Sequence, residues 1–517
     1  MKYLPIGIQN FNIIREENYY YVDKTSFIHD LVKDGGKYYF LSRPRRFGKS
    51  LFVDTLNRAF LGQKDYFEGL FLEDKWNWEK SYPVIFMSFG AGVIRDRDDL
   101  DVKFDYLLKT EARRLGVELT FKTVREQFLE LIENASKKYN QKIVILVDEY
   151  DKPILDNIDK PDLAVEMREG LKNFYSVIKD SGQYIKFVFI TGVSKFSKVS
   201  LFSGLNNLED ITLEKKYSSI CGYTQEELET VFADRLEGVD LEKVRKWYNG
   251  YNWLGERVYN PFDILLYLNS KEFRNYWFET ATPTFLIKLL EAGQYYIPDL
   301  SHLSAGEEII GSFEVEDIRV ETLLFQTGYL TIKSFEQIGA FRRYDLTYPN
   351  LEVEAGLNNY ILSALVKDRS AKTRNQSAVL DALQKNDFAK LKKTIHAFFA
   401  SIPNQWYRKN VLAQYEGYYA SIFYCYFAAL GLDITPEETT NQGLIDLVVR
   451  FDDRVYIFEF KVVELTRKGN ALSQIKSKKY YQKYSDRNVY LIGVEFSKDD
   501  RNIVNFEWEM MDPSCLN

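Results

Sequence analysis

Histidine and cysteine are scarce in this chain of 517 residues, which contains 3 of each. The histidines, His29, His302 and His396, lie far apart, so the sequence argues against a multi-histidine metal site and against a Ser–His hydrolase. The cysteines are equally scattered and have no metal-ligand spacing, which predicts reduced thiols of the cytosolic kind. Any metal is therefore expected on oxygen ligands.

Long apolar runs and proline-rich linkers are also missing. No stretch of about 18 apolar residues occurs and the first residues lack the apolar core of a signal peptide, so we expect a cytoplasmic protein with no membrane partner. The chain is long enough for two to four domains, and its 12 prolines form no linker, which favours domains packed together. A net charge of −7 argues against nucleic-acid binding over the whole surface but allows a local basic channel.

One segment near the start combines an apolar run, a loop and a helix pattern. Residues 38–41 are apolar, residues 43–50 end in Gly-Lys-Ser, and residues 51–60 have apolar side chains at helical spacing. Unpaired N–H groups at a helix N-terminus attract phosphate, Lys49 can reach the β- and γ-phosphates, and Ser50 can ligate Mg²⁺. An arginine occupies the position of the usual first glycine, so this motif alone also allows a helix start with a surface lysine.

Two further apolar runs fit a nucleotide site. Residues 142–149 end in Asp148 and Glu149, as expected of a buried parallel strand whose carboxyl end meets the ligand. Asp148 is predicted to hold magnesium through water, and Glu149 to orient or deprotonate the attacking water. The run 187–192 is predicted to place Thr191 beside the γ-phosphate as a sensor. Each run alone also suits a plain core strand, but their order favours an NTPase.

A second candidate site lies near the C-terminus, where residues 443–463 predict two strands joined by a turn at 451–454. Asp446 lies in the first strand in apolar surroundings, and Glu459 and Lys461 share one face of the second. Two carboxylates and a lysine suit phosphodiester hydrolysis with Mg²⁺ or Mn²⁺, which lowers the pKa of a bound water. The alternative is an amphipathic edge hairpin with a solvated Glu–Lys face, although a carboxylate in apolar surroundings then needs another partner.

Helices are predicted on both sides of this hairpin. Glu416 begins an upstream helix and is a candidate third metal ligand, or else a solvated residue favoured by the helix dipole. Downstream, residues 471–480 predict a basic amphipathic helix on which Gln474 and Lys478 lie one turn apart. These two side chains are candidates for nucleic-acid phosphate contacts, although a basic helix is also commonly just a solvated surface.

The N-terminal half resembles the AAA-ATPase-like family of bacterial genomes. The matching segments are residues 4–7, 20–25, 43–50, 147–151 and 190–194. In that family the loop begins with arginine, so the missing glycine is a feature of the family. The resemblance implies an ATP site with Mg²⁺, built by Arg45, Arg46, Phe47, Gly48, Lys49, Ser50, Asp148 and Thr191. Arg45 and Arg46 are candidate arginine fingers within the chain, and an arginine from a neighbouring subunit is the alternative, which allows an oligomer.

The C-terminal part resembles the PD-(D/E)XK nuclease superfamily, which is commonly fused to this ATPase. The resemblance puts Glu416, Asp446, Glu459 and Lys461 on the catalytic pattern, with Gln474 and Tyr480 on the following helix. Ile445 stands where the name-giving proline occurs, and Leu444 stands where relatives often carry an arginine, which removes one phosphate contact.

The predicted fold class is α/β: a P-loop NTPase parallel sheet, a mostly helical, winged-helix-like middle, and a C-terminal PD-(D/E)XK nuclease-like fold. The predicted boundaries are 1–215, 216–404 and 405–517. The predicted function is an ATP-binding and ATP-hydrolysing protein coupled to a metal-dependent phosphodiester hydrolase, with DNA favoured over RNA. The alternative is a nucleotide-dependent switch or scaffold whose nuclease-like domain binds nucleic acid or protein without cleavage.

Overall fold

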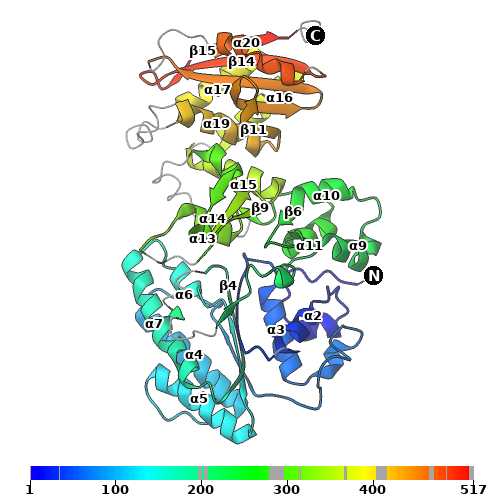
Figure 1. Ribbon diagram of the computed structural model, residues 1–517, viewed down its shortest axis with the longest axis vertical. Helices are drawn as coiled ribbons and strands as arrows, with labels where there is room; N and C mark the ends of the chain where they lie inside the picture. Colours follow the sequence, from blue (N-terminus) through cyan, green and yellow to red (C-terminus); the bar gives the residue numbers. More distant parts are fainter. Residues whose placement is uncertain are drawn as a thin grey trace. The chain divides into compact units, whose positions relative to one another are not determined.

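The computed structural model describes residues 2–33, 35–195, 201–202, 208–278, 296–311, 314, 316–365, 369–402, 416–464, 471–484 and 486–511. The chain forms two compact units, one of Met1–Ala281 with Ser304–Asn350, and one of Thr282–Leu303 with Leu351–Asn517. Each unit combines a β-sheet with helices (Figure 1), which confirms the predicted α/β fold class.

The first unit is built on a five-stranded parallel sheet in the order β2-β3-β4-β1-β5. Its strands are β1 (Tyr38–Ser42), β2 (Val84–Ser88), β3 (Ile143–Asp148), β4 (Ile185–Gly192) and β5 (Glu209–Asp210). The four longer strands consist mainly of buried apolar residues, as expected when helices cover both faces of a sheet. Because all strands run in the same direction, their carboxyl ends meet at one edge.

Helices cover the two faces of this sheet. Figure 1 shows α4 (Arg97–Leu115), α5 (Val124–Tyr139) and α7 (Pro161–Asp180) on one side, and α2 (Thr25–Lys33) and α3 (Lys49–Phe60) on the other. On the first side the rings of α4, α5 and α7 stack, with centroids 4.0 Å apart for Phe104 and Phe174 and 4.6 Å apart for Phe128 and Phe174. Aromatic stacking of this kind fixes the three helices against one another.

The same unit contains the mostly helical middle segment, residues 216–278 and 304–350, as predicted. Its helices are α9 (Gln225–Val231), α10 (Leu241–Tyr248), α11 (Pro261–Ser270) and α14 (Val320–Thr327), and its longer strands are β9 (Thr331–Ile338) and β10 (Phe341–Thr347). Gly328 ends α14 with a φ of 94°, in the left-handed region that favours glycine, and β9 follows. Buried aromatic rings fill the segment, including Tyr248, Tyr251, Trp253 and Tyr259.

A short hairpin within this segment carries two of these rings, Tyr251 and Tyr259. Its strands are β6 (Asn249–Tyr251) and β7 (Val258–Tyr259). Gly250 has a φ of 135°, and a Cβ atom there would lie 1.8 Å from the Pro349 carbonyl oxygen. Only glycine fits both the backbone conformation and this close approach.

The second unit contains a five-stranded sheet in the order β11-β12-β13-β14-β15. The strands are β11 (Asp433–Thr440), β12 (Gly443–Phe451), β13 (Arg454–Val462), β14 (Asn488–Ser497) and β15 (Asn502–Met510). All neighbours are antiparallel except β13 and β14. Phe423 of α19 (Glu416–Ala429) packs on Phe460 from one face, and Ile475 of α20 (Ala471–Lys478) packs on Val448 and Ile457 from the other.

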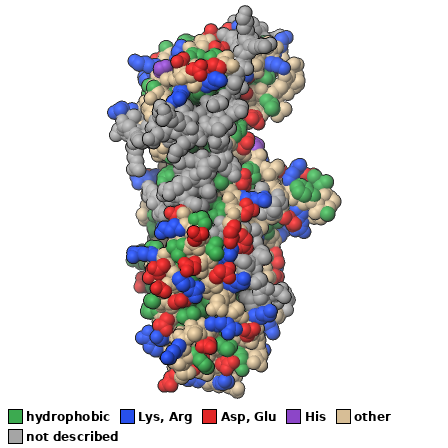
Figure 2. Space-filling view, turned by 90° about the vertical axis from the view of Figure 1, so that its left-hand side faces the viewer, with side chains coloured by type: hydrophobic (Ala, Val, Ile, Leu, Met, Phe, Trp, Pro, Cys, Tyr) green, Lys and Arg blue, Asp and Glu red, His purple; other side chains and the backbone are tan. Residues whose placement is uncertain are grey.

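The three predicted domain boundaries remain a prediction. Residues 216–281 and 304–350 belong to the unit of the parallel sheet, whereas residues 351–404, which include α16 (Arg369–Lys385) and α17 (Phe388–Ser401), belong to the second unit. Across the described ranges, the helices fall short of the length and apolarity needed to cross a membrane. On the face shown in Figure 2, acidic and basic side chains are interspersed rather than gathered into one broad patch of a single charge.

Candidate nucleotide and nuclease sites

The Gly-Lys-Ser loop opens α3 at the carboxyl end of β1. Gly48 is the N-cap with a φ of 90°, and α3 begins at Lys49. Glycine suits this left-handed position, which leaves the first N–H groups of α3 facing the loop. The Lys49 ammonium donates to the carbonyl oxygens of Arg43 and Pro44, both at 2.9 Å. Burial lowers the pKa of Lys49, and the nearby Asp148 carboxylate acts in the opposite direction.

Asp148 lies at the end of β3 and is only 3% exposed. Burial raises its pKa, while a hydrogen bond from the Ser50 side chain and the charge of Lys49 lower it. Its Oδ1 atom is buried and has no hydrogen-bond partner among the described residues. A buried carboxylate oxygen is costly without a partner, and oxygen ligands of this kind suit Mg²⁺. Ser50 and Asp148 therefore fit a magnesium ion held together with phosphate.

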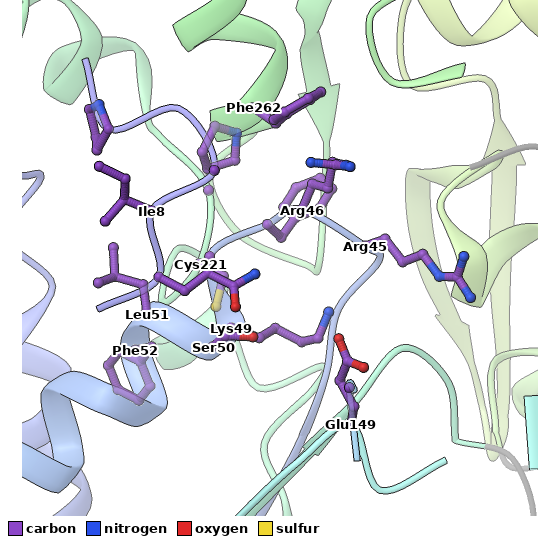
Figure 3. Close-up of a pocket in the computed structure, with 18 of the residues that line it drawn as sticks. Ile8, Arg45, Arg46, Lys49, Ser50, Leu51, Phe52, Glu149, Cys221 and Phe262 are labelled. Carbon is purple, nitrogen blue, oxygen red and sulfur yellow. The ribbon is translucent and has the colours of Figure 1, made fainter. Parts of the chain in front are cut away.

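Glu149 follows directly and has a φ of 55°, an unusual value for a residue other than glycine. Figure 3 shows its carboxylate facing the Lys49 ammonium. Gly90 makes room for this carboxylate, because a Cβ atom at that position would lie 2.9 Å from Glu149 Oε2. Strained backbone at a cavity is typical of functional sites, so the geometry supports a chemical role for this carboxylate.

A cavity of about 490 Å³ adjoins these groups. That volume lies in the range of small-ligand and cofactor sites. Its polar wall is formed by the loop with Glu149 and Asp151. Its apolar wall is formed by Pro5, Gly7 and Ile8 and by Pro261, Phe262 and Leu265 of α11. The lining includes Arg45, Arg46, Phe47, Gly48, Lys49 and Ser50, of which Figure 3 labels Arg45, Arg46, Lys49 and Ser50.

Three predicted nucleotide residues have contacts that the sequence did not show. Thr191 does not line the cavity: it is fully buried, and its hydroxyl donates to the Leu41 carbonyl at 2.9 Å, while its sensor contact with the γ-phosphate stays a prediction. The Phe47 ring is buried and packs against Tyr251 in the middle segment. The Arg46 guanidinium lies 4.0 Å above the Phe262 ring.

Asp151 is a site residue that the sequence reasoning did not single out. It lines the cavity, is fully buried, and accepts hydrogen bonds from the backbone of Val193 and from both the backbone and hydroxyl of Ser194. Burial raises its pKa, and these donors lower it. Asp151 thus ties the end of β3 to the end of β4. The signal was the second aspartate of the Asp-Glu-Tyr-Asp segment, which no strand pattern distinguishes.

The second candidate site lies on the α20 face of the C-terminal sheet. Asp446 Oδ2 accepts a hydrogen bond of 2.7 Å from the Phe460 N–H, where β12 and β13 diverge. Glu459 is 1% exposed, and its Oε1 accepts from Lys461 Nζ at 3.1 Å and from the Gln474 amide. Burial raises the pKa of Tyr480, as do the charges of Glu459 and Asp446, while Lys461 opposes them. The structure therefore gathers these predicted residues in one place.

The remaining predicted residues of this site differ in position. Lys478 is exposed on α20, Leu444 is 52% exposed, and Ile445 is buried. The side chain of Glu416 lies outside the described residues, although its backbone begins α19. Within the described ranges no group of three or more His, Cys, Asp or Glu side chains forms a metal cluster. Two carboxylates still fit Mg²⁺, which commonly keeps several waters and binds substrate phosphates.

Gly493 positions α20 beside this site, and replacing it is expected to disturb both folding and the site. Gly493 pairs with Glu459 in register, and an added Cβ atom would lie 2.3 Å from the Leu472 backbone nitrogen. Gly493→Ala must push α20, and Gln474 with it, away from Glu459, at a cost of about 1–3 kcal/mol of unfolding free energy. Chemical denaturation measures this cost.

A matched control for this prediction is Gly417→Ala in α19, whose added Cβ atom would meet only ordinary contacts at 3.4 and 3.5 Å. Alanine favours helices over glycine, so this variant should be as stable as the parent or slightly more stable. Equal stability of Gly493→Ala and the parent would contradict the proposed packing.

Comparison with known proteins agrees with both resemblances, that of the N-terminal part and that of the C-terminal part. Residues 5–202 match the family described as Predicted AAA-ATPase, and residues 414–506 match the PD-(D/E)XK nuclease superfamily. The chain is also 52% identical over 513 residues to the "Uncharacterized protein in vnfD 5'region" of Azotobacter chroococcum mcd 1, covering 99% of each chain. The chain therefore belongs to the family of AAA-ATPase-like proteins that carry a C-terminal domain of the PD-(D/E)XK nuclease superfamily.

Proposed function

We propose that this protein binds and hydrolyses ATP with Mg²⁺ and couples this to a divalent-metal-dependent phosphodiester hydrolase that acts on nucleic acid. The observation that carries the proposal is that Lys49, Ser50 and Glu149 line one cavity and that the Ser50 side chain is hydrogen-bonded to the buried Asp148. These side chains supply the charges and the water contact that phosphoryl transfer requires.

At the first site, the N–H groups at the start of α3 and the Lys49 ammonium bind phosphate oxygens. Lys49 must exchange its hydrogen bonds to the Arg43 and Pro44 carbonyls for the phosphate. Ser50 and Asp148 hold the magnesium, which neutralises charge that develops on the phosphates. Glu149 orients the attacking water or accepts its proton. Arg45 and Arg46, both exposed and both lining the cavity, are the candidate arginine fingers within the chain.

At the second site, Asp446 and Glu459 hold Mg²⁺ or Mn²⁺, which supplies a bound water of lowered pKa. Lys461 orients the nucleophile or offsets charge on the scissile phosphate. Gln474 fixes the carboxylate of Glu459, and Lys478 on the exposed side of α20 contacts the nucleic-acid backbone. Glu416 is proposed as a third ligand, and DNA is favoured over RNA.

The remaining proposals follow from the sequence. We propose a cytoplasmic location. We also propose an ATPase domain of residues 1–215, a lid and connector of residues 216–404 and a nuclease domain of residues 405–517. A neighbouring subunit is the alternative source of an arginine finger.

One observation favours a second function, a nucleotide-dependent switch or scaffold that binds nucleic acid or protein without cutting. The same oxygen of Glu459, Oε1, accepts from both Lys461 and Gln474. A carboxylate held by two protein donors is also what a structural ion pair looks like.

A cleavage assay separates the two functions. The full chain is incubated with double-stranded DNA, single-stranded DNA and RNA, with Mg²⁺, Mn²⁺ or chelator, and with or without ATP. The enzyme predicts cutting that needs the metal and is lost in Asp446→Ala. Intact ATP turnover without cutting of any substrate would favour the switch.

A further inference from the structure

The first arginine of the loop is buried inside the protein. Arg43 stands where a P-loop usually has glycine, is 1% exposed, and lies outside the cavity lining. Its Nη1 donates to the carbonyls of Ser42 and Thr212 at 2.9 Å, and its Nη2 donates to the Tyr217 carbonyl at 3.0 Å. The guanidinium thus binds the segment after β5 through backbone oxygens. Burial lowers its pKa to about 10, so the group remains charged at neutral pH.

Arg43 also contacts an aromatic ring of the middle segment, that of Trp253. Its guanidinium carbon lies 4.2 Å from the centroid of the Trp253 ring. The Phe47 ring, at the other end of the loop, meets Trp253 edge-on with centroids 5.3 Å apart. Trp253 is therefore in contact with both ends of the loop, and it is only 4% exposed. Cation–π contacts gain strength when water is excluded.

A third contact approaches the loop from α14. A Cβ atom at Gly328 would lie 2.8 Å from Pro44 Cβ, so glycine allows the end of this helix to reach the loop. The Gly222 N–H donates to the Phe47 carbonyl at 3.1 Å. The loop is thus held on several sides by the middle segment, and not only by its own strand and helix.

We propose that Arg43, Phe47 and Trp253 form an anchor that positions the P-loop for nucleotide and transmits nucleotide binding to the middle segment. The inference rests on the proposed ATP site. Phosphate binding takes the Lys49 ammonium from the carbonyls of Arg43 and Pro44. The guanidinium of Arg43 lies on the Trp253 ring, and Pro44 lies against Gly328. A movement of the loop therefore changes both contacts with the middle segment. Arg43 acts as a positioning residue, since it does not line the cavity.

The test is intrinsic tryptophan fluorescence of the full chain with a non-hydrolysable ATP analogue and Mg²⁺, with binding measured separately by calorimetry. The chain has 7 tryptophans, so Trp253→Phe is needed to isolate the signal. The parent is expected to change its fluorescence on binding, and Trp253→Phe to lose most of that change while still binding the analogue. Trp247→Phe, whose ring packs on Tyr248 and Phe273, should keep it.

Arg43→Lys tests the positioning role. Lysine keeps the charge but has neither the planar fork nor the stacking surface. Affinity for the analogue should fall about tenfold, as expected when charged hydrogen bonds are lost, and the Trp253 signal should shrink. Arg125→Lys, at a surface pair with Asp180, should leave both unchanged.

The outcomes distinguish this inference from the function on which it rests. Binding with an equal fluorescence change in the parent and in Trp253→Phe would overturn the anchor and leave the ATP site intact. Binding by Arg43→Lys with the parent's affinity and signal would do the same. No binding by the folded parent chain would overturn the ATP site and the anchor together.

Discussion

Glu149→Gln is expected to lower ATP turnover by about two to four orders of magnitude, the usual contribution of a general base, while ATP still binds. Glutamine preserves the shape of the side chain but cannot accept a proton. The carboxylate faces the Lys49 ammonium from a backbone of positive φ, and Gly90 keeps the space for it. Phosphate release measures turnover, and calorimetry measures binding.

A matched control for Glu149→Gln is Glu133→Gln, on the surface of α5, where the carboxylate pairs with Lys137. This variant should hydrolyse ATP at the parent's rate. Turnover by Glu149→Gln at the parent's rate would contradict the role of this carboxylate and would favour a loop that binds ATP without hydrolysing it.

Lys461→Ala is expected to lower phosphodiester cleavage by at least about a hundredfold, as the loss of one electrostatic group at a reacting phosphate does. ATP turnover should not change, because Lys461 and the P-loop belong to different units. Lys461 donates to Glu459 at 3.1 Å and is only 16% exposed in its side chain, so its loss also leaves a buried carboxylate with one donor fewer. The measurement is cleavage of the best substrate found in the panel.

The control for Lys461→Ala is Lys385→Ala, an exposed residue of α16 that pairs with Asp381. It should cut at the parent's rate. Cleavage by Lys461→Ala at that rate, with the protein folded, would show that another site performs the cutting or that Lys461 is structural.

The positions of both sites could be predicted from the sequence because strand ends carry them. A short apolar run followed by Gly48, Lys49 and Ser50 specifies strand, loop and helix locally, and parallel strands bring Asp148 to the same edge. Residues two apart on a strand share a face, which places Glu459 and Lys461 together. These inferences need only local pattern and the direction of the strands.

The surroundings of Arg43 and Thr191 could not be predicted, because they depend on contacts between segments that are distant in the sequence. Arg43 gave no sign that it would be buried against carbonyls from Thr212 and Tyr217, about 170 residues away. Thr191 lies at the end of the expected strand, but its hydroxyl turns to Leu41 on β1. A strand pattern gives the faces of a strand and not which neighbouring backbone group a hydroxyl finds, so this hydrogen bond was not predictable.

The most direct test of the account is a calorimetric titration of the parent and of Lys49→Ala with a non-hydrolysable ATP analogue and Mg²⁺. We expect one nucleotide per chain for the parent and an affinity lowered by at least about tenfold in the folded variant, since a charged phosphate contact is lost. Equal affinity in the two proteins would contradict it, because the cavity beside Lys49 would then not be the nucleotide site.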